Sequence, residues 1–195
     1  MCGRFFVDKK AREIDRLLER LGGAADEIKA GEIFPTNIAL ALVKGEKGPE
    51  PTGMEWGLPR WDGKGAIINA RAETALEKIM FRSALLTSPL AIPASGFFEW
   101  KANPDGGKEK FLFQSVDGGL LYLAGFGKRS PDAIARFCLL TTEANDSVRP
   151  IHHRMPLLLG EDELGAWING ENIASFLARR PMPVKAEKIA GTRHK

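Results

Sequence analysis

Short apolar runs separated by turn-forming residues recur along most of this chain, a pattern that predicts many β-strands. The runs lie at 37–43, 54–58, 66–70, 90–100, 110–116, 120–126, 136–142 and 155–159. Residues 110–126 give the clearest local prediction, two strands joined by a turn at Asp117–Gly118. The stretch 103–107 predicts another turn before them, so we expect these strands to form a meander.

Fewer segments have the spacing of an amphipathic helix. The clearest is 8–23, where Asp8 is a predicted N-cap and Gly22–Gly23 a predicted end. Its apolar positions repeat at helical spacing: Ala11, Ile14, Leu17, Leu18 and Leu21.

Three more helices are predicted further along the chain. One covers 73–86, with Ala75, Ile79 and Leu86 expected on or near its buried side. Two short ones cover 161–170 and 171–180, the second ended by Pro181.

Strands and helices do not alternate regularly, which argues against a doubly wound parallel sheet. We therefore expect an α+β fold with a mixed, mainly antiparallel sheet, a barrel-like core and flanking helices. A length of 195 residues suits one core, and we see no repeats or linker, so a single domain over 1–195 is expected. The last five residues are expected to be a frayed tail.

Composition narrows the class of protein. Hydrophobic residues make up 44% and charged residues 27%, as in ordinary globular proteins. Without a long apolar run or a signal segment, we expect a cytoplasmic protein with no membrane association. The chain has two cysteines and no cluster with zinc-ligand spacing. We therefore expect no disulfide framework, no bound metal and no cofactor. A net charge of +3 permits nucleic-acid binding without arguing for it.

Four stretches place isolated polar groups among apolar or glycine neighbours: "MCGRF" at the start, "NARAET" at 69–74, "PASGFFEW" at 93–100 and "IHHRMP" at 151–156. Cys2 is distinctive because Met1 is commonly removed when a small residue follows it. Removal would leave an α-amine and a thiol on adjacent carbons of Cys2. The other cysteine, Cys138, lies in an apolar run and is interpreted as a core residue.

The second stretch places an amide and a guanidinium together. On a strand Asn69, Arg71 and Glu73 share a face, where they could orient a small polar group and bind a phosphate or carboxylate. The alternative is a solvated strand end followed by a helix at Glu73.

The third stretch surrounds Glu99 with Phe97, Phe98 and Trp100. This carboxylate either sits at the surface or has a raised pKa suited to general acid–base chemistry.

The fourth stretch holds two of the three histidines of the chain. Adjacent residues of an extended segment point to opposite faces, so only one of His152 and His153 is expected in a given site, with Arg154 on the face of His152.

Arginines fall in or next to these stretches, with aromatic residues nearby. Cations that follow phosphates and rings that stack on bases are typical of a groove for single-stranded nucleic acid. The alternative is that Trp56, Trp100 and Phe5 are core residues. The arginines are Arg4, Arg71, Arg82, Arg149 and Arg154.

The order and separation of "MCGRF", "WGL", "NARAET", "PASGFFEW" and "IHHRMP" resemble those of the SOS response-associated peptidase (SRAP) family, over nearly the whole chain. The resemblance implies a single α+β domain around a β-barrel-like core, acting as a monomer on abasic sites in single-stranded DNA. It implies a thiazolidine crosslink through Cys2 after Met1 removal, with self-processing and lyase side activities, during the SOS response at the nucleoid.

The resemblance also assigns roles to residues. Asn69 would orient the amine of Cys2, while Glu99 and His152 would move protons; His152 is chosen because the family pattern favours the first histidine of the pair. The expected DNA contacts are Arg4, Arg71, Arg82, Arg154 and, against the bases, Trp56. Two departures are Phe98, where a tyrosine is common, and a "WGLPRW" segment one residue shorter than usual, which affects Trp56 and Pro59.

Two other classes remain open. Glutamine amidotransferases of the N-terminal nucleophile class also begin Met-Cys-Gly, and there the thiol attacks an amide. "NARAET" and "IHHRMP" have no place in that scheme. A non-catalytic DNA-binding module, with Cys2 as a buried thiol, is the third interpretation.

Overall fold

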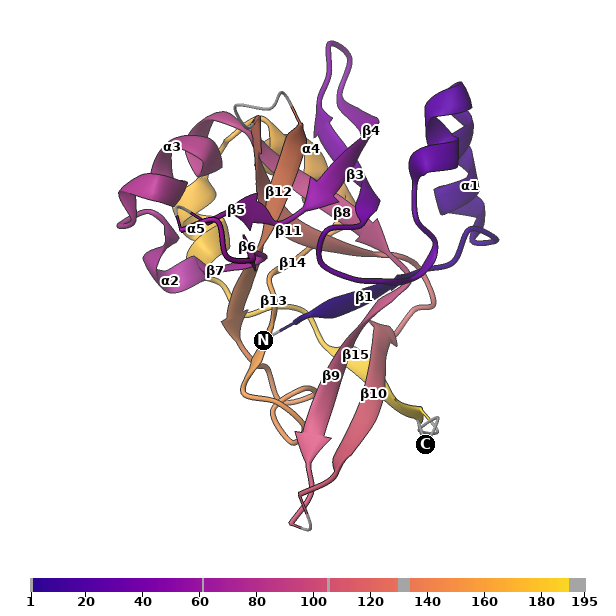
Figure 1. The fold of residues 1–195 in the computed structure, drawn as a ribbon, viewed down its shortest axis with the longest axis vertical. Coiled ribbons are helices and arrows are strands. Elements are labelled where there is room, and N and C mark those ends of the chain that lie inside the picture. The colour runs from indigo at the N-terminus through magenta and orange to yellow at the C-terminus, as the bar shows by residue number, and fades with distance from the viewer. Residues whose placement is uncertain (1, 61, 105, 130–133, 190–195) are drawn as a thin grey trace.

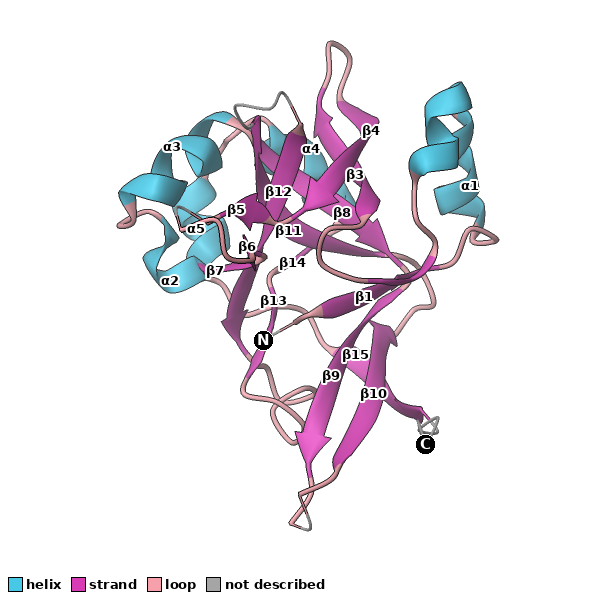
Figure 2. Ribbon diagram, viewed as in Figure 1, coloured by secondary structure: helices cyan, strands magenta, loops and turns pink. Residues whose placement is uncertain are grey.

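The computed structural model describes residues 2–60, 62–104, 106–129 and 134–189. The predicted frayed tail lies outside these ranges. The described elements are mostly strands, with short helices on the outside (Figure 2). The expected α+β class with a mainly antiparallel sheet is confirmed.

One sheet has five strands in the order β15-β10-β9-β1-β2, and every pairing in it is antiparallel. Its members are β1 (Arg4–Val7), β2 (Gly31–Ile33), β9 (Gly96–Ala102), β10 (Lys108–Ser115) and β15 (Val184–Ile189). β9 and β10 form a hairpin that extends away from the rest of the molecule (Figure 1). The turn predicted at 103–107 is therefore confirmed.

The second sheet curls into a ring, because β11 pairs with both β8 and β12. The ring follows the order β12-β4-β3-β8-β11 and contains β3 (Ile38–Lys44), β4 (Pro49–Trp56), β8 (Pro89–Ala94), β11 (Leu121–Arg129) and β12 (Ala135–Glu143). Its added short strands are β7 (Asn69–Arg71), β13 (Arg154–Pro156) and β14 (Leu158–Leu159). β7 and β4 lie parallel to β12, so the sheet is mixed. The expected barrel-like core is confirmed.

Helices cover the outside of the ring. α2 (Ala72–Ala75), α3 (Ile79–Thr87) and α5 (Ile173–Ala178) gather on one side, and α1 (Arg12–Glu19) lies on the other (Figure 1). The remaining short elements are η1 (Gly22–Glu27), β5 (Leu58–Pro59), β6 (Ala66–Ile67), η2 (Glu161–Glu163) and α4 (Leu164–Ile168). None of the described helices combines the length and apolarity that crossing a bilayer would need.

Apolar side chains fill two connected regions. One lies between the five-stranded sheet and the ring, where Phe5 packs on Trp56 with ring centroids 5.0 Å apart and Trp56 stacks on Phe137. The other lies under the helices around Trp167, and it contains Cys138, as predicted. Burial of these side chains supplies the main stabilising free energy of the fold.

Three predicted details are wrong. Gly118 does form a turn, but β10 and β11 are not paired with each other: β10 pairs with β9 and β15, and β11 with strands of the ring. The turn therefore carries the chain from one sheet to the other. In α1 the N-cap is Ala11 rather than Asp8, which instead accepts a hydrogen bond from the Lys10 N–H.

The helix predicted over 73–86 is interrupted after Ala75 and begins again at Ile79. The interruption changes the helical phase, so Ile79 is 91% exposed and Leu86 47% exposed, while Phe81, Ala84 and Leu85 are buried.

Candidate active site

The start of the chain is held by the second sheet. Asn69 Nδ2 donates a hydrogen bond of 2.7 Å to the carbonyl oxygen of Cys2, across 67 positions of sequence. β7 presents this amide because it lies parallel to β12, with Asn69 opposite Leu139. Asn69 Oδ1 is buried and has no hydrogen-bond partner within the described residues. The Cys2 thiol is fully buried, with its Sγ 3.5 Å from the Arg4 carbonyl oxygen.

Glu99 lies just past the end of the pairing between β1 and β9. The last described pair is Arg4 with Phe98, so the ladder ends one residue before Glu99, where Gly3 leads into β1. Glu99 is nevertheless only 2% exposed, and its Oε1 lies 3.7 Å from His152 Nδ1. Both residues line a cleft of about 600 Å³, together with Gly3, Arg4, Trp100, Ala102 and Lys108.

Burial sets the protonation of these groups. It raises the pKa of Glu99 to about 7, which places this carboxyl at its titration midpoint near neutrality. Burial also lowers the pKa of His152 and favours the neutral imidazole. The pKa of the Cys2 thiol is strongly raised, first by burial and second by the charge of Glu99. The sulfur is therefore a protonated thiol in the resting protein.

His152 Nδ1 lies 3.0 Å from both the backbone nitrogen and the backbone oxygen of Arg154. A bare Nδ1 can accept the backbone N–H, whereas a protonated Nδ1 can donate to the carbonyl oxygen. The ring therefore has a hydrogen-bond partner in either state, as a proton carrier requires.

The site contains Cys2, an amide that holds its backbone, and a buried carboxyl with a pKa of about 7 beside the imidazole of His152. Residues 1–190 match the SOS response associated peptidase (SRAP) family. The chain belongs to the SRAP family.

Curated relatives agree with this assignment. The chain is 28% identical to the abasic site processing protein YoaM of Bacillus subtilis, with 97% of this chain and 88% of that protein covered. It is 29% identical to the abasic site processing protein YedK of Escherichia coli, covering 88% and 81%. A crystal structure from Bacteroides thetaiotaomicron has the same fold, with a TM-score of 0.82, 23% identity, and 97% and 92% coverage.

Two DNA contacts expected from the SRAP resemblance lie in unexpected places. Trp56 is fully buried and donates from Nε1 to the Ile68 carbonyl oxygen at 3.0 Å, so the structure assigns it to the core rather than to a base. Arg154 is 8% exposed; its guanidinium binds both oxygens of Glu73, at 2.7 and 2.9 Å, and the Thr141 carbonyl oxygen. Arg154 could reach a phosphate only by giving up this ion pair.

The other expected cations are more accessible. Arg71 and Arg82 are exposed on β7 and α3, and Arg4 lines the cleft. The strand predicted at Asn69 and Arg71 is present, but Glu73 belongs to α2, so the strand end followed by a helix is also present.

His152 and His153 do not point to opposite faces. Their rings stack with centroids 4.5 Å apart because the segment turns there instead of extending.

The charged surroundings of Arg4 were not predicted from the sequence. Glu32 of β2 and Lys110 of β10 meet beside it, and Lys108 lines the same cleft. The alternation of Lys108 and Lys110 along one strand was the available signal, but the position of β10 beside β9 was needed to interpret it.

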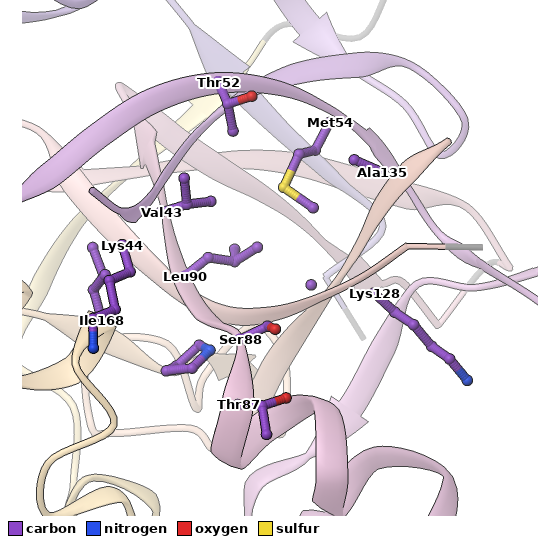
Figure 3. Close-up of a pocket in the computed structure, with 12 residues that line it drawn as sticks. Val43, Lys44, Thr52, Met54, Thr87, Ser88, Leu90, Lys128, Ala135 and Ile168 are labelled. Carbon is purple, nitrogen blue, oxygen red and sulfur yellow. The ribbon is translucent and has the colours of Figure 1, made fainter. Parts of the chain in front are cut away.

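A second hollow, of about 390 Å³, has a separate lining that includes residues of β3, β4, β8, β11 and β12 (Figure 3). Met54 and Leu90 form part of its lining, and Lys44 and Lys128 stand at its sides. None of the candidate site residues Cys2, Asn69, Glu99 and His152 lines this hollow. Within the described part of the chain, no group of three or more His, Cys, Asp or Glu side chains is placed to hold a metal ion.

Proposed function

We propose that this protein processes abasic sites in single-stranded DNA and attaches to them covalently through Cys2 once Met1 has been removed. The observation that carries the proposal is that Glu99 and His152 line one cleft, while Cys2, held by Asn69, directly precedes Gly3 and Arg4 of the same lining. Several relatives are named as abasic site processing proteins, and the proposal extends that activity to this chain.

The chemistry needs both groups of an N-terminal cysteine. A ring-opened abasic sugar presents an aldehyde, and an α-amine with a pKa of about 7.7–8.0 is substantially neutral at physiological pH, unlike a lysine. The amine nitrogen bonds to the aldehyde carbon, and the oxygen leaves as water to give a Schiff base. The Cys2 sulfur then adds to the same carbon while its proton passes to nitrogen, which closes a five-membered thiazolidine.

Asn69 is suited to hold the amine in line. Its Nδ2 already fixes the Cys2 carbonyl oxygen, and the buried Oδ1 is an acceptor for an N–H of the amine that Met1 removal would create. Satisfying a buried acceptor in this way favours the processed terminus over other positions.

Glu99 and His152 are suited to move the protons. A carboxyl with a pKa of about 7 can accept a proton from the thiol as sulfur bonds to carbon, and can protonate the departing oxygen. His152 can relay protons beside it, because its Nδ1 has a partner in both states. We expect Arg4, Arg71 and Arg82 to bind phosphates of the strand.

The test is the intact mass of the protein before and after incubation with a single-stranded oligonucleotide that carries one abasic site. We expect loss of Met1, followed by an adduct equal in mass to protein plus oligonucleotide minus water. Cys2→Ala should abolish the adduct. Cys2→Ser keeps the amine but not the thiol, so the Schiff base should partition toward strand cleavage.

A processed protein that forms no adduct would overturn the proposal. Glutamine hydrolysis by that same preparation would favour the amidotransferase class instead, and DNA binding that is unchanged in Cys2→Ala, without an adduct, would favour a non-catalytic module.

A further inference from the structure

Arg4, Glu32 and Lys110 form a charged cluster on the rim of the cleft. Glu32 Oε1 accepts hydrogen bonds from Arg4 Nη1 at 3.0 Å and from Lys110 Nζ at 2.7 Å, and its Oε2 accepts a second one from Lys110 at 2.7 Å. The cluster joins three neighbouring parts of the five-stranded sheet: β1, β2 and the β9–β10 hairpin. Two cations thus enclose a pair of anionic oxygens.

Aromatic rings fix the two cations in place. The Arg4 guanidinium lies over the rings of Phe34 and Trp100, 4.5 and 4.9 Å from their centroids. Lys110 Nζ lies 3.9 Å from the centroid of Phe98. Cation–π contacts of this kind contribute about 0.5–1 kcal/mol each at exposed sites, and they favour this arrangement of the charges independently of the carboxylate.

Within the described part of the chain, the Arg4 guanidinium donates a hydrogen bond only from Nη1, although a guanidinium has five N–H donors. Arg4 and Trp100 also line the cleft that contains Glu99 and His152. The cluster therefore adjoins the path that a strand must take to reach Cys2.

A carboxylate and a phosphodiester both present two anionic oxygens to paired cations. We propose that Arg4 and Lys110 form a phosphodiester subsite for the DNA strand and that Glu32 occupies it as an internal competitor until a phosphate displaces it. This inference rests on the proposed function. Glu32 neutralises one of the two positive charges, so it weakens binding to any DNA strand. Selectivity for abasic over undamaged strands then comes from the reaction at Cys2.

The test measures the affinity for an undamaged single-stranded oligonucleotide over a range of salt concentrations. Each phosphate contact contributes about 0.7 to the slope of log affinity against log salt for single strands. Glu32→Gln leaves both cations unopposed, so the slope should steepen by about 0.7, and affinity should fall about threefold more between 50 and 200 mM salt than it does for the wild type.

Lys110→Met removes one cation and should reduce the slope by a similar amount. The double variant restores the wild-type net charge of the cluster and should return the slope to near the wild-type value. The two single variants and the double variant together form a double-mutant cycle, so the test does not depend on one variant alone. A thermal melt of each variant reports whether it is folded.

Glu55→Gln is the matched control. Glu55 has the same side-chain exposure as Glu32, 26%, and pairs with Arg136 at 2.9 Å, but neither Glu55 nor Arg136 lines the cleft. Its substitution changes the net charge equally and should leave the slope unchanged. A slope that steepens equally in both variants would show a general charge effect and overturn the subsite.

Inorganic phosphate separates a strand site from a free-anion site. At equal ionic strength it should displace no more oligonucleotide than chloride does; greater displacement would assign the pair of cations to free anions instead. If Glu32→Gln leaves the slope unchanged while the wild type still forms the abasic adduct, the subsite fails and the proposed function stands. If the slope steepens but no adduct forms, the subsite stands and the proposed function fails.

Discussion

The buried carboxyl of Glu99 makes the stability of the protein depend on pH. Burial holds the pKa of this group at about 7 in the folded chain, against an ordinary value of 4.5. Between these values the unfolded chain has released the proton that the folded chain retains. Stability contributed by the protonated group is therefore fully present below about pH 4.5 and is lost as the pH rises through about 7.

The size of the effect follows from the two pKa values. Each pKa unit corresponds to about 1.4 kcal/mol, so ionising Glu99 in its buried position costs the fold about 3 kcal/mol at most. Glu99→Gln keeps the shape of the side chain and removes the titration. Relative to the wild type, this variant should gain about 2 kcal/mol of unfolding free energy between pH 5 and pH 8.

Urea denaturation of both proteins at a series of pH values measures this difference. Glu187→Gln is the control, because it removes an exposed carboxylate from β15 and should keep the pH dependence of the wild type. The variant that gains stability should also form the abasic adduct at least about a hundredfold more slowly, because it has lost its general acid–base group. Parallel stability curves for Glu99→Gln and the wild type would refute the assignment of Glu99 as a group that titrates near neutrality.

Three further substitutions test other contacts. Asn69→Leu keeps the branched side-chain shape but removes the amide oxygen and nitrogen near Cys2, so single-turnover mass measurements should give an adduct rate at least about tenfold lower. Arg154→Met leaves Glu73 without its partner; because that carboxylate is partly exposed, urea denaturation should show a loss of about 2 kcal/mol. Trp56→Ala opens a cavity in the core and should cost about 3–5 kcal/mol in the same assay.

Local patterns in the sequence predicted most of the strands and the class of fold, because alternating apolar residues report burial on one face. These patterns did not predict which strands pair when the strands are far apart in the sequence. The turn at Asp117–Gly118 reverses the chain, but β10 and β11 then join different sheets, since each has other strands against which to pair. The short break after Ala75 similarly turned Ile79 outward, and the sequence there carries no proline or glycine to mark it.

The site was predictable to the extent that its residues lie in compact motifs. Cys2, Asn69, Glu99 and His152 were each singled out from their neighbours, and the fold brings them together. The misplaced residues depend on contacts between distant segments. Trp56 is in the core because Phe5 and Phe137 pack against it, and Arg154 is held by Glu73, 81 positions away. No local pattern contains that information.

The burial of Glu99 is related to where the pairing of β1 with β9 ends. If β1 paired further along β9, the cleft beside Glu99 would be filled by chain; if it ended earlier, the carboxyl would be solvated and its pKa would fall toward the ordinary value. The ladder ends with Arg4 opposite Phe98, and Glu99, one residue further along β9, is buried and lines the cleft. The proposed crosslink needs Cys2 close to Glu99, and β1, which begins two residues after Cys2, pairs with the strand that carries Glu99.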